Sequence, residues 1–190
     1  MFEEYGISQV VTSSPHCFHT FRNTYALFGA LGDDAGKVVF NTRHYTQVLA
    51  QLVAQDRIRF DRQMSITVTF HDPCYLGRYN RIFDAPRNVI KAIPGVRLKE
   101  MRHHGPDSLC CGGGGDRMWQ EELDGEPKMS VIRIREADAV GAELIITACP
   151  LCLIMLEDAR KSDDLENKLR VMDLNELVVR ALGLGGKQSA

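Results

Sequence analysis

The stretch "ELIITACPLCLIML" (143–156) contains the pattern that decides the fold of this 190-residue chain. Its first half is rich in β-branched residues and predicts a buried strand, whereas its second half has the apolar spacing of a helix. Pro150 stands at the junction, where the first turn of a helix accepts a proline. Cys149 and Cys152 flank that turn. The stretch therefore predicts a strand that leads directly into a helix, with two thiols between them.

The same alternation of strand and helix extends along the chain. Pro127, Pro150 and Asp173 mark helix starts, because proline suits the first helical turn and aspartate caps it. We expect an α/β fold with a mainly parallel sheet flanked by helices. The expected strands are 8–14, 37–42, 65–71, 95–101, 143–149 and 168–174, and the expected helices are 42–55, 85–93, 127–141, 150–161 and 174–183.

An internal echo suggests two related units. "VVTSSPHCFHTF" (10–21) repeats the order of "IITACPLCLIML" (145–156): a strand end, Thr, a small residue, Ser or Cys, then Pro-x-Cys and an apolar helix. Only the second unit is complete. We expect a partial first unit, a complete second unit and a disordered tail. The corresponding ranges are 1–60, 61–183 and 184–190.

Composition narrows the class of protein. The net charge is −2, and Lys and Arg are scattered along the chain, so we expect no nucleic-acid partner. The N-terminus "MFEEYG" is acidic, and the sequence lacks an apolar run long enough to span a membrane. These features predict a cytoplasmic chain. In that reducing compartment, six cysteines are metal ligands or redox groups more often than a disulfide framework.

Five of the six cysteines form one pattern, C-x35-CC-x37-C-x2-C, and each follows a predicted strand or precedes a predicted helix. In an open parallel sheet such positions converge on one crevice. We therefore expect these thiols to meet, although they are far apart in the sequence. They are Cys74, Cys110, Cys111, Cys149 and Cys152.

The number of thiols favours an iron-sulfur cluster. A zinc ion takes four ligands, whereas five thiols suit a larger group that needs several thiolates. Zinc and buried free thiols stay open as alternatives. Thiol exchange through Cys149-Pro150-Leu151-Cys152 is less attractive, because it leaves three cysteines unexplained.

The tetraglycine that follows the cysteine pair predicts a nest of backbone N–H groups around an anionic group. We expect Gly112, Gly113 and Gly114 to bind the cofactor in this way, with Trp119 packed beneath the loop. A phosphate loop would end in Gly-Lys-Ser/Thr, but this loop ends in "GDRM". A flexible linker is the other alternative.

Further side chains stand close to the cysteine blocks. His71 is a candidate catalytic residue that could orient a ligand or give a proton to a sulfur, and a packed strand residue is the alternative. Asp72 is expected to cap its turn. His16 and His19 lack paired-ligand context, and Cys17 is expected to be a leftover thiol, because Ser14 breaks its motif.

Three blocks contain the five cysteines: "HDPCYLGRYN" (71–80), "CCGGGGDRMW" (110–119) and "TACPLCLIMLEDA" (147–159). Together they resemble the CCG cysteine-rich domain of the heterodisulfide reductase group, which includes iron-sulfur subunits linking electron-transfer flavoprotein to menaquinone. The resemblance implies that the five cysteines named above hold a noncubane [4Fe-4S] cluster.

The resemblance also implies a function. We expect an iron-sulfur redox subunit of a heterodisulfide-reductase-like oxidoreductase, which passes electrons to a disulfide-type, quinone or flavin partner. Its partners would be ferredoxin-like, flavoprotein or membrane quinone-reactive subunits, which would place it at the inner face of the plasma membrane. The alternative from another class is a non-catalytic, zinc-stabilised binding module.

Overall fold

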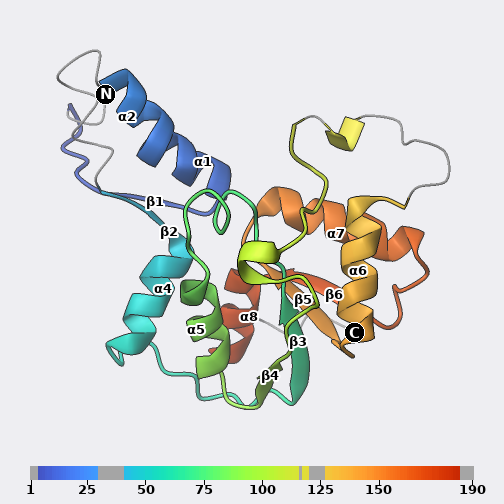
Figure 1. Ribbon diagram of the computed structural model, residues 1–190. Helices are drawn as coiled ribbons and strands as arrows, with labels where there is room; N and C mark the ends of the chain where they lie inside the picture. The colour runs from blue at the N-terminus through green and yellow to red at the C-terminus, as the bar shows by residue number, and fades with distance from the viewer. Residues whose placement is uncertain (1–3, 30–40, 116, 120–126, 185–190) are drawn as a thin grey trace.

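A four-stranded parallel sheet lies between two groups of helices (Figure 1). The computed structural model describes residues 4–29, 41–115, 117–119 and 127–184. The order across the sheet is β4-β3-β5-β6, and every neighbouring pair is parallel. The mainly parallel α/β fold is therefore confirmed. The strands are β3 (Ile66–Phe70), β4 (Val96–Leu98), β5 (Leu144–Thr147) and β6 (Arg170–Asp173).

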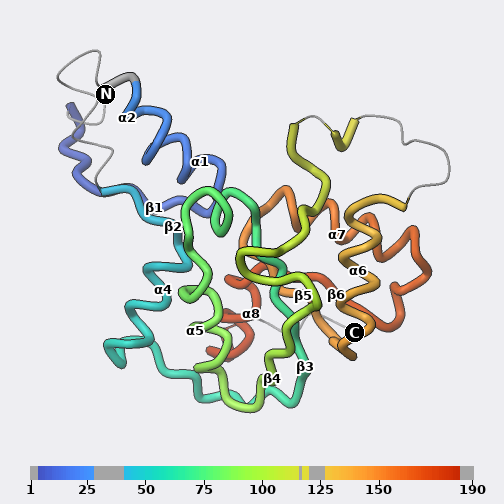
Figure 2. The backbone as a smooth tube through the Cα atoms, in the orientation of Figure 1, coloured from blue at the N-terminus to red at the C-terminus, as the bar shows by residue number. Residues whose placement is uncertain are grey.

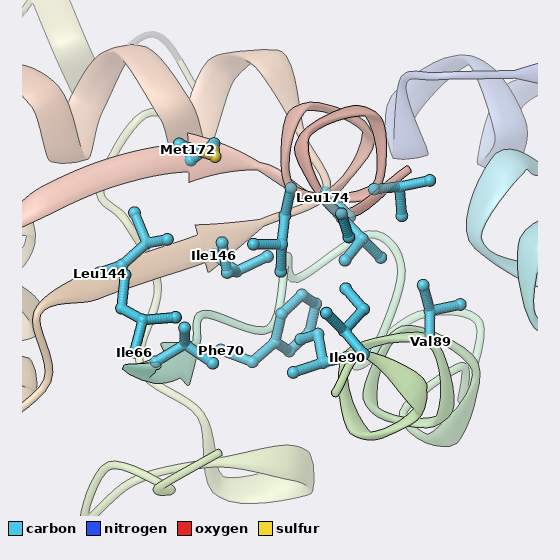
Figure 3. Close-up of a cluster of buried hydrophobic side chains, with 14 of the residues drawn as sticks. Ile66, Phe70, Val89, Ile90, Leu144, Ile146, Met172 and Leu174 are labelled. Carbon is cyan, nitrogen blue, oxygen red and sulfur yellow. The ribbon is translucent and has the colours of Figure 1, made fainter. Parts of the chain in front are cut away.

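The two central strands carry the core. Every residue of β3 and β5 is buried, as expected for parallel strands that are covered on both faces. On one face, Phe70 of β3 and Ile146 of β5 pack with Ile90 of α5 (Asp84–Ala92) in a cluster that α4 (Tyr45–Ala54) and α8 (Leu174–Ala181) also join (Figure 3).

The opposite face of the sheet has a separate apolar cluster. There, Ile145 of β5 packs with Ile134 of α6 (Met129–Ala139) and Leu156 of α7 (Pro150–Ser162). Both helices owe their burial to apolar residues on the face that meets the sheet. The fold is thus a three-layer sandwich of helix, sheet and helix.

The connections define a switch point between β3 and β5. The chain leaves β3 through α5 toward β4, on one face of the sheet. It returns through α6 to β5 and continues through α7 to β6, on the other face. Parallel α/β sheets bind ligands where the direction of winding reverses, beyond the carboxyl ends of the strands. In this chain that place is the carboxyl end of β3 and β5.

A second, two-stranded parallel sheet contains β1 (Val10–Thr12) and β2 (Thr42–His44). After β1 comes α1 (Pro15–His19), then a π-helical turn (Thr20–Thr24) and α2 (Tyr25–Gly29). These helices extend away from the main sheet (Figures 1 and 2).

The internal echo seen in the sequence has a structural counterpart. α1 begins with Pro15 directly after β1, just as α7 begins with Pro150 after β5. β2 pairs with β1 and leads into α4, just as β6 pairs with β5 and leads into α8. The division of the chain at residue 60 stays a prediction.

Several element boundaries differ from the sequence expectations. β2 covers Thr42–His44 because these residues pair with Val10–Thr12, although the local pattern ended the strand at residue 42 and began the helix there. Residues 37–40 of the expected strand and 185–190 of the expected tail lie outside the described residues. Pro127 precedes α6 instead of starting it. By contrast, Pro150 starts α7, and Asp173 caps α8 by accepting a hydrogen bond from the Asn175 N–H at 2.9 Å.

The expected turn cap at Asp72 is replaced by a buried ion pair. The carboxylate of Asp72 accepts two hydrogen bonds from the Arg87 guanidinium, at 2.7 and 2.9 Å, and one from the Gly105 N–H at 2.8 Å. Arg87 also donates to Glu100 at 2.8 and 3.0 Å. Bidentate pairing of this kind is strong and directional. One cation thus joins the end of β3, α5 and the segment after β4.

Among the helices of the described ranges, none has the length and apolar character needed to cross a membrane.

Replacement of Arg87 by Met should strongly destabilise the fold. Asp72 is 3% exposed, so its charge would be left buried without a counterion, at a cost of about 3–5 kcal/mol. Urea denaturation measures the free energy of unfolding. Arg59→Met is the control, because its ion pair with Asp56 is exposed and should contribute less than about 1 kcal/mol. Equal losses in the two variants would contradict the prediction.

His44 should make the fold sensitive to acid. Burial lowers the pKa of His44 to about 4, from an ordinary value of 6.5. Between these values the unfolded chain binds a proton that the folded chain does not, so the free energy of unfolding falls as the pH drops. The fall due to His44 should approach about 3 kcal/mol. In urea denaturation from pH 7.5 to 4, His44→Asn should lose less stability than the wild type, and parallel curves would contradict this.

Candidate functional site

The thiols lie beyond the carboxyl ends of β3 and β5, at the switch point of the sheet. Cys74 follows β3 in a tight turn, in which the N–H of Leu76 bonds to the carbonyl of Pro73 at 3.0 Å. Cys149 is the N-cap of α7, and Cys152 lies in the first turn of that helix. The Cys110–Cys111 pair comes from the long connection between β4 and α6. Strand ends and one crossover therefore supply all of these side chains.

The five thiols form a continuous series of contacts, as the sequence predicted. Cys74 and Cys111 each donate a side-chain hydrogen bond to Cys110, and Cys152 donates to Cys111 and to Cys149. Cys111, Cys149 and Cys152 are buried, whereas Cys74 and Cys110 are half-buried. The group therefore has a closed interior and an open side.

The hydrogen bonds concentrate negative charge on two sulfurs. Bonds from Cys111 and then Cys74 lower the pKa of Cys110 to about 2, and the bond from Cys152 lowers the pKa of Cys149. The donors respond in the opposite sense: the bond to Cys110 raises the pKa of Cys111 to about 12, and bonds to Cys111 and Cys149 raise the pKa of Cys152. Thiolates are the form that binds metals, so the site is prepared for a group that contains metal cations.

Two of the glycines act on these sulfurs. The N–H of Gly112 donates to the sulfur of Cys110 at 3.3 Å, and the N–H of Gly113 donates to the sulfur of Cys111. Gly112 has a φ of +82°, which favours glycine. A Cβ on Gly113 would stand 2.8 Å from the Cγ of Met155 in α7, whereas one on Gly114 would meet open space. Backbone conformation and steric crowding thus explain why positions 112 and 113 are glycine, but neither explains the glycine at position 114.

The expectation for Trp119 is wrong. Its side chain is 78% exposed and belongs to a short 3-10 turn, Arg117–Trp119. The glycine loop approaches Leu151 and Met155 of α7 so closely that no aromatic ring fits beneath Gly113. The glycine loop therefore packs on α7, and Trp119 does not lie beneath it as the sequence suggested.

His71 lies beside the thiols. It is buried at 1% exposure directly after β3, and ligand atoms of His71, Cys111 and Cys152 lie within 4.8 Å of one another. Burial, followed by the nearby Arg133, lowers the pKa of His71 to about 3. The imidazole is thus neutral across the physiological range. Its role stays a prediction, although its position at the sulfurs goes beyond that of an ordinary packed residue.

Sequence reasoning missed Arg133. Its side chain is fully buried, and its Nε donates to the Nδ1 of His71 at 3.2 Å. Its Nη1 donates to the His103 carbonyl at 2.7 Å and pairs with Glu136. The helical spacing of the sequence could have indicated its burial, because Arg133 lies one turn before Ala137 on the face of α6 that packs on the sheet.

His16 was also missed. Its Nδ1 lies 4.0 Å from the sulfur of Cys149, and its ring lies 4.2 Å from the ring of Tyr75, measured between centroids. Its neighbour Cys17 is exposed, in agreement with a leftover thiol. The Pro-His-Cys order in the sequence is enough to place His16 in the first turn of α1. That its ring faces Cys149 follows only from how α1 packs in the structure.

Comparison with known proteins links these residues to a family. The family described as "CCG: Cysteine-rich domain" matches residues 68–157, which include all five clustered cysteines. The probable iron-sulfur-binding oxidoreductase FadF of Bacillus subtilis is 40% identical over 192 residues, covering 98% of this chain and 26% of the relative.

Two further relatives have related names. The EtfAB:quinone oxidoreductase of Syntrophomonas wolfei is 32% identical over 189 residues, covering 95% of this chain and 25% of the relative. A subunit of the dihydromethanophenazine:CoB--CoM heterodisulfide reductase of Methanosarcina barkeri is 40% identical over 146 residues, covering 76% of this chain and 35% of the relative. The chain thus spans between 25% and 35% of the length of these curated relatives.

Gly113→Val should disturb the site through α7. The branched side chain would collide with Leu151 and Met155, and overpacking of this kind costs about 1–3 kcal/mol. We also expect less iron per chain after anaerobic loading, because the loop carries the N–H groups that face the sulfurs. Gly114→Val is the matched control, since open space surrounds that position and its φ is not positive. Iron content in folded Gly113→Val equal to that of the wild type would show that the loop acts only as a linker.

Proposed function

Because the chain belongs to the CCG cysteine-rich domain family, we propose that it is the iron-sulfur part of an oxidoreductase that transfers electrons through a cluster bound by its five grouped cysteines. The observation that carries the proposal is the continuous series of thiol contacts at the switch point of the sheet. The names of the relatives support the class of reaction, since they include iron-sulfur-binding and quinone oxidoreductases.

The residues present fit such a cofactor. The proposed ligands are cysteine side chains, whose thiolate form iron-sulfur clusters require, and Gly112 directs an N–H at one of the sulfurs. The His71 Nε2 is a buried polar atom with no hydrogen-bond partner among the described residues, and its ring lies near Cys111 and Cys152. An anionic group at this place would give that atom a partner. The proposed ligands are Cys74, Cys110, Cys111, Cys149 and Cys152.

The cofactor we propose is a [4Fe-4S] cluster, in the noncubane form that the resemblance implies. When bound, an iron-sulfur cluster supplies one-electron chemistry at a potential set by charge, hydrogen bonding and solvent exposure. The chain contributes a closed interior around Cys111, Cys149 and Cys152 and an open side at Cys74 and Cys110. Electrons would enter or leave on the open side, because transfer needs close approach of the partner.

The partners we propose are other redox units: ferredoxin-like, flavoprotein or membrane quinone-reactive subunits. A quinone acceptor resides in the membrane, so such partners would hold the chain at the inner face of the plasma membrane. The terminal acceptor would be a quinone, a flavin or a disulfide-type substrate. The names of two relatives, a quinone oxidoreductase and a heterodisulfide reductase, support these classes.

One observation favours a second candidate, a zinc site with a structural role. His71, Cys111 and Cys152 present three ligand atoms within 4.8 Å, and a fourth thiol would complete a tetrahedral set. That arrangement leaves two of the grouped thiols without a function. Protein purified without oxygen separates the candidates, because an iron-sulfur protein is brown and contains acid-labile sulfide, whereas a zinc protein is colourless.

Cys149→Ala and Cys17→Ala test the ligand set together. Cys149 is buried within the thiol group, so its loss should remove most of the iron or alter the EPR spectrum of the reduced protein. Cys17 is exposed and should be replaceable with unchanged iron content. The measurements are iron and sulfide per chain and EPR spectra of the full chain prepared anaerobically. Loss of the cluster from Cys17→Ala but not from Cys149→Ala would contradict the ligand assignment.

A further inference from the structure

A buried pair of side chains lies behind the thiol group and takes no part in the ligand set proposed above. His71 and Arg133 are 1% and 0% exposed, and the Arg133 Nε donates to the His71 Nδ1 at 3.2 Å. The backbone N–H of His71 also bonds to the Ile146 carbonyl at 2.8 Å, which continues the β3–β5 ladder. The imidazole is therefore held from both its backbone and its ring.

The partner of Nδ1 determines where the proton of the imidazole lies. A guanidinium only donates hydrogen bonds, so the Nδ1 that faces it must be the acceptor, without a hydrogen. A neutral imidazole carries one ring hydrogen, which must then reside on Nε2. This nitrogen is buried and has no partner among the described residues, and the ring comes within 4.8 Å of the sulfurs of Cys111 and Cys152. The ring hydrogen of His71 is thus on the nitrogen that does not face Arg133, in a ring that borders these two sulfurs.

The same argument weighs against His71 as a metal ligand. Ligation through Nε2 requires a lone pair on that nitrogen, so the ring hydrogen would have to move to Nδ1. There it would point at the N–H of Arg133, and the 3.2 Å hydrogen bond would become a contact between two donors. Ligating histidines normally donate their second N–H to an acceptor, and Arg133 provides none.

Arg133 adds charge to this arrangement. Glu136 neutralises one side of its guanidinium, but Nη2 is buried without a hydrogen-bond partner among the described residues. Its charge also acts on Cys152 through space. Because the interior screens charge weakly, a cation at this place favours negative charge on the sulfurs.

We propose that His71 directs its Nε2–H toward the thiol site, where a bound anionic group would accept it, and is not a ligand, and that Arg133 is the positioning residue that fixes this tautomer. The inference rests on the proposed function only where it concerns a bound cluster. There, the N–H and the buried cation stabilise the charge added when one electron enters from an external reductant, and so raise the reduction potential. The metal-tuning role follows from charge and hydrogen bonding to sulfur.

The tautomer can be measured in the wild-type chain without metal. Nitrogen-15 NMR of the reduced, metal-free protein with labelled histidine should show His71 with a hydrogen on Nε2 and none on Nδ1. In Arg133→Met, the preference for this tautomer should weaken. A hydrogen on Nδ1 in the wild type would overturn the proposal. The wild-type measurement alone decides this point, and it requires neither a folded variant nor a bound cluster.

Redox titration of the iron-loaded chain, monitored by EPR with dithionite as the reductant, tests the effect on potential. His71→Leu and Arg133→Met should each shift the ratio of reduced to oxidised cluster at least tenfold toward the oxidised form at a fixed potential, which is about 59 mV for one electron. His71→Gln retains an N–H and should recover much of the shift. Arg135→Met is the matched control, since this residue of α6 is exposed and pairs with Asp163.

The outcomes separate this proposal from the proposed function. Unchanged potentials in His71→Leu and Arg133→Met would overturn the tuning role. Loss of iron from both His71→Leu and His71→Gln, to the extent seen in Cys149→Ala, would make His71 a ligand and also overturn it. Absence of iron and sulfide from the anaerobic wild type would end the proposed function, and the tautomer of the metal-free chain would still decide whether His71 directs its Nε2–H toward the thiol site.

Discussion

The pairing of β3 with β5 is the constraint on which the thiol site depends. Phe70 lies opposite Ile146 in the parallel register, and the N–H of His71 extends the ladder by one more bond. This pairing makes the two strands end at the same edge, while the chain departs from them in opposite directions. Cys74 and Cys149 therefore join one thiol group although they are far apart in the sequence, and the cysteine pair from the crossover between β4 and α6 connects Cys74 to this group.

A concentration of thiolates in a mostly closed site requires compensation, because burial of a charge without a partner is costly. The structure supplies it from several directions. The Gly112 N–H reaches Cys110, the N–H groups at the start of α7 lower the pKa of Cys149, and Arg133 places a cation behind Cys152. None of these groups is a proposed ligand. The site is thus prepared for an anionic cofactor by the backbone and by the side chains behind the sulfurs.

Local patterns in the sequence predicted much of this arrangement. The strand pattern of 65–71 predicted β3, and the proline at position 150 predicted the start of α7. The placement of cysteines at strand ends predicted that the thiols lie together. The side chains that surround the thiols were harder. Helical spacing places Arg133 on the buried face of α6, but the groups that it meets there depend on how α6 packs. The exposure of Trp119 likewise follows from the close packing of α7 on the glycine loop, which the local sequence does not encode.

The N-terminal half-unit shows how a repeated motif can take a different part in the same site. Ser14 and Cys149 are equivalent N-caps before Pro15 and Pro150, so the repeat places a hydroxyl where the complete unit has a thiol. The half-unit instead packs over part of the thiol group, because His16 of α1 brings its Nδ1 to 4.0 Å from the sulfur of Cys149. Tyr45 packs in the main core, and its hydroxyl donates to the Asp173 carboxylate at 2.8 Å. The half-unit therefore packs directly against the thiol site, since His16 of α1 borders Cys149 and Tyr45 of α4 belongs to the main core.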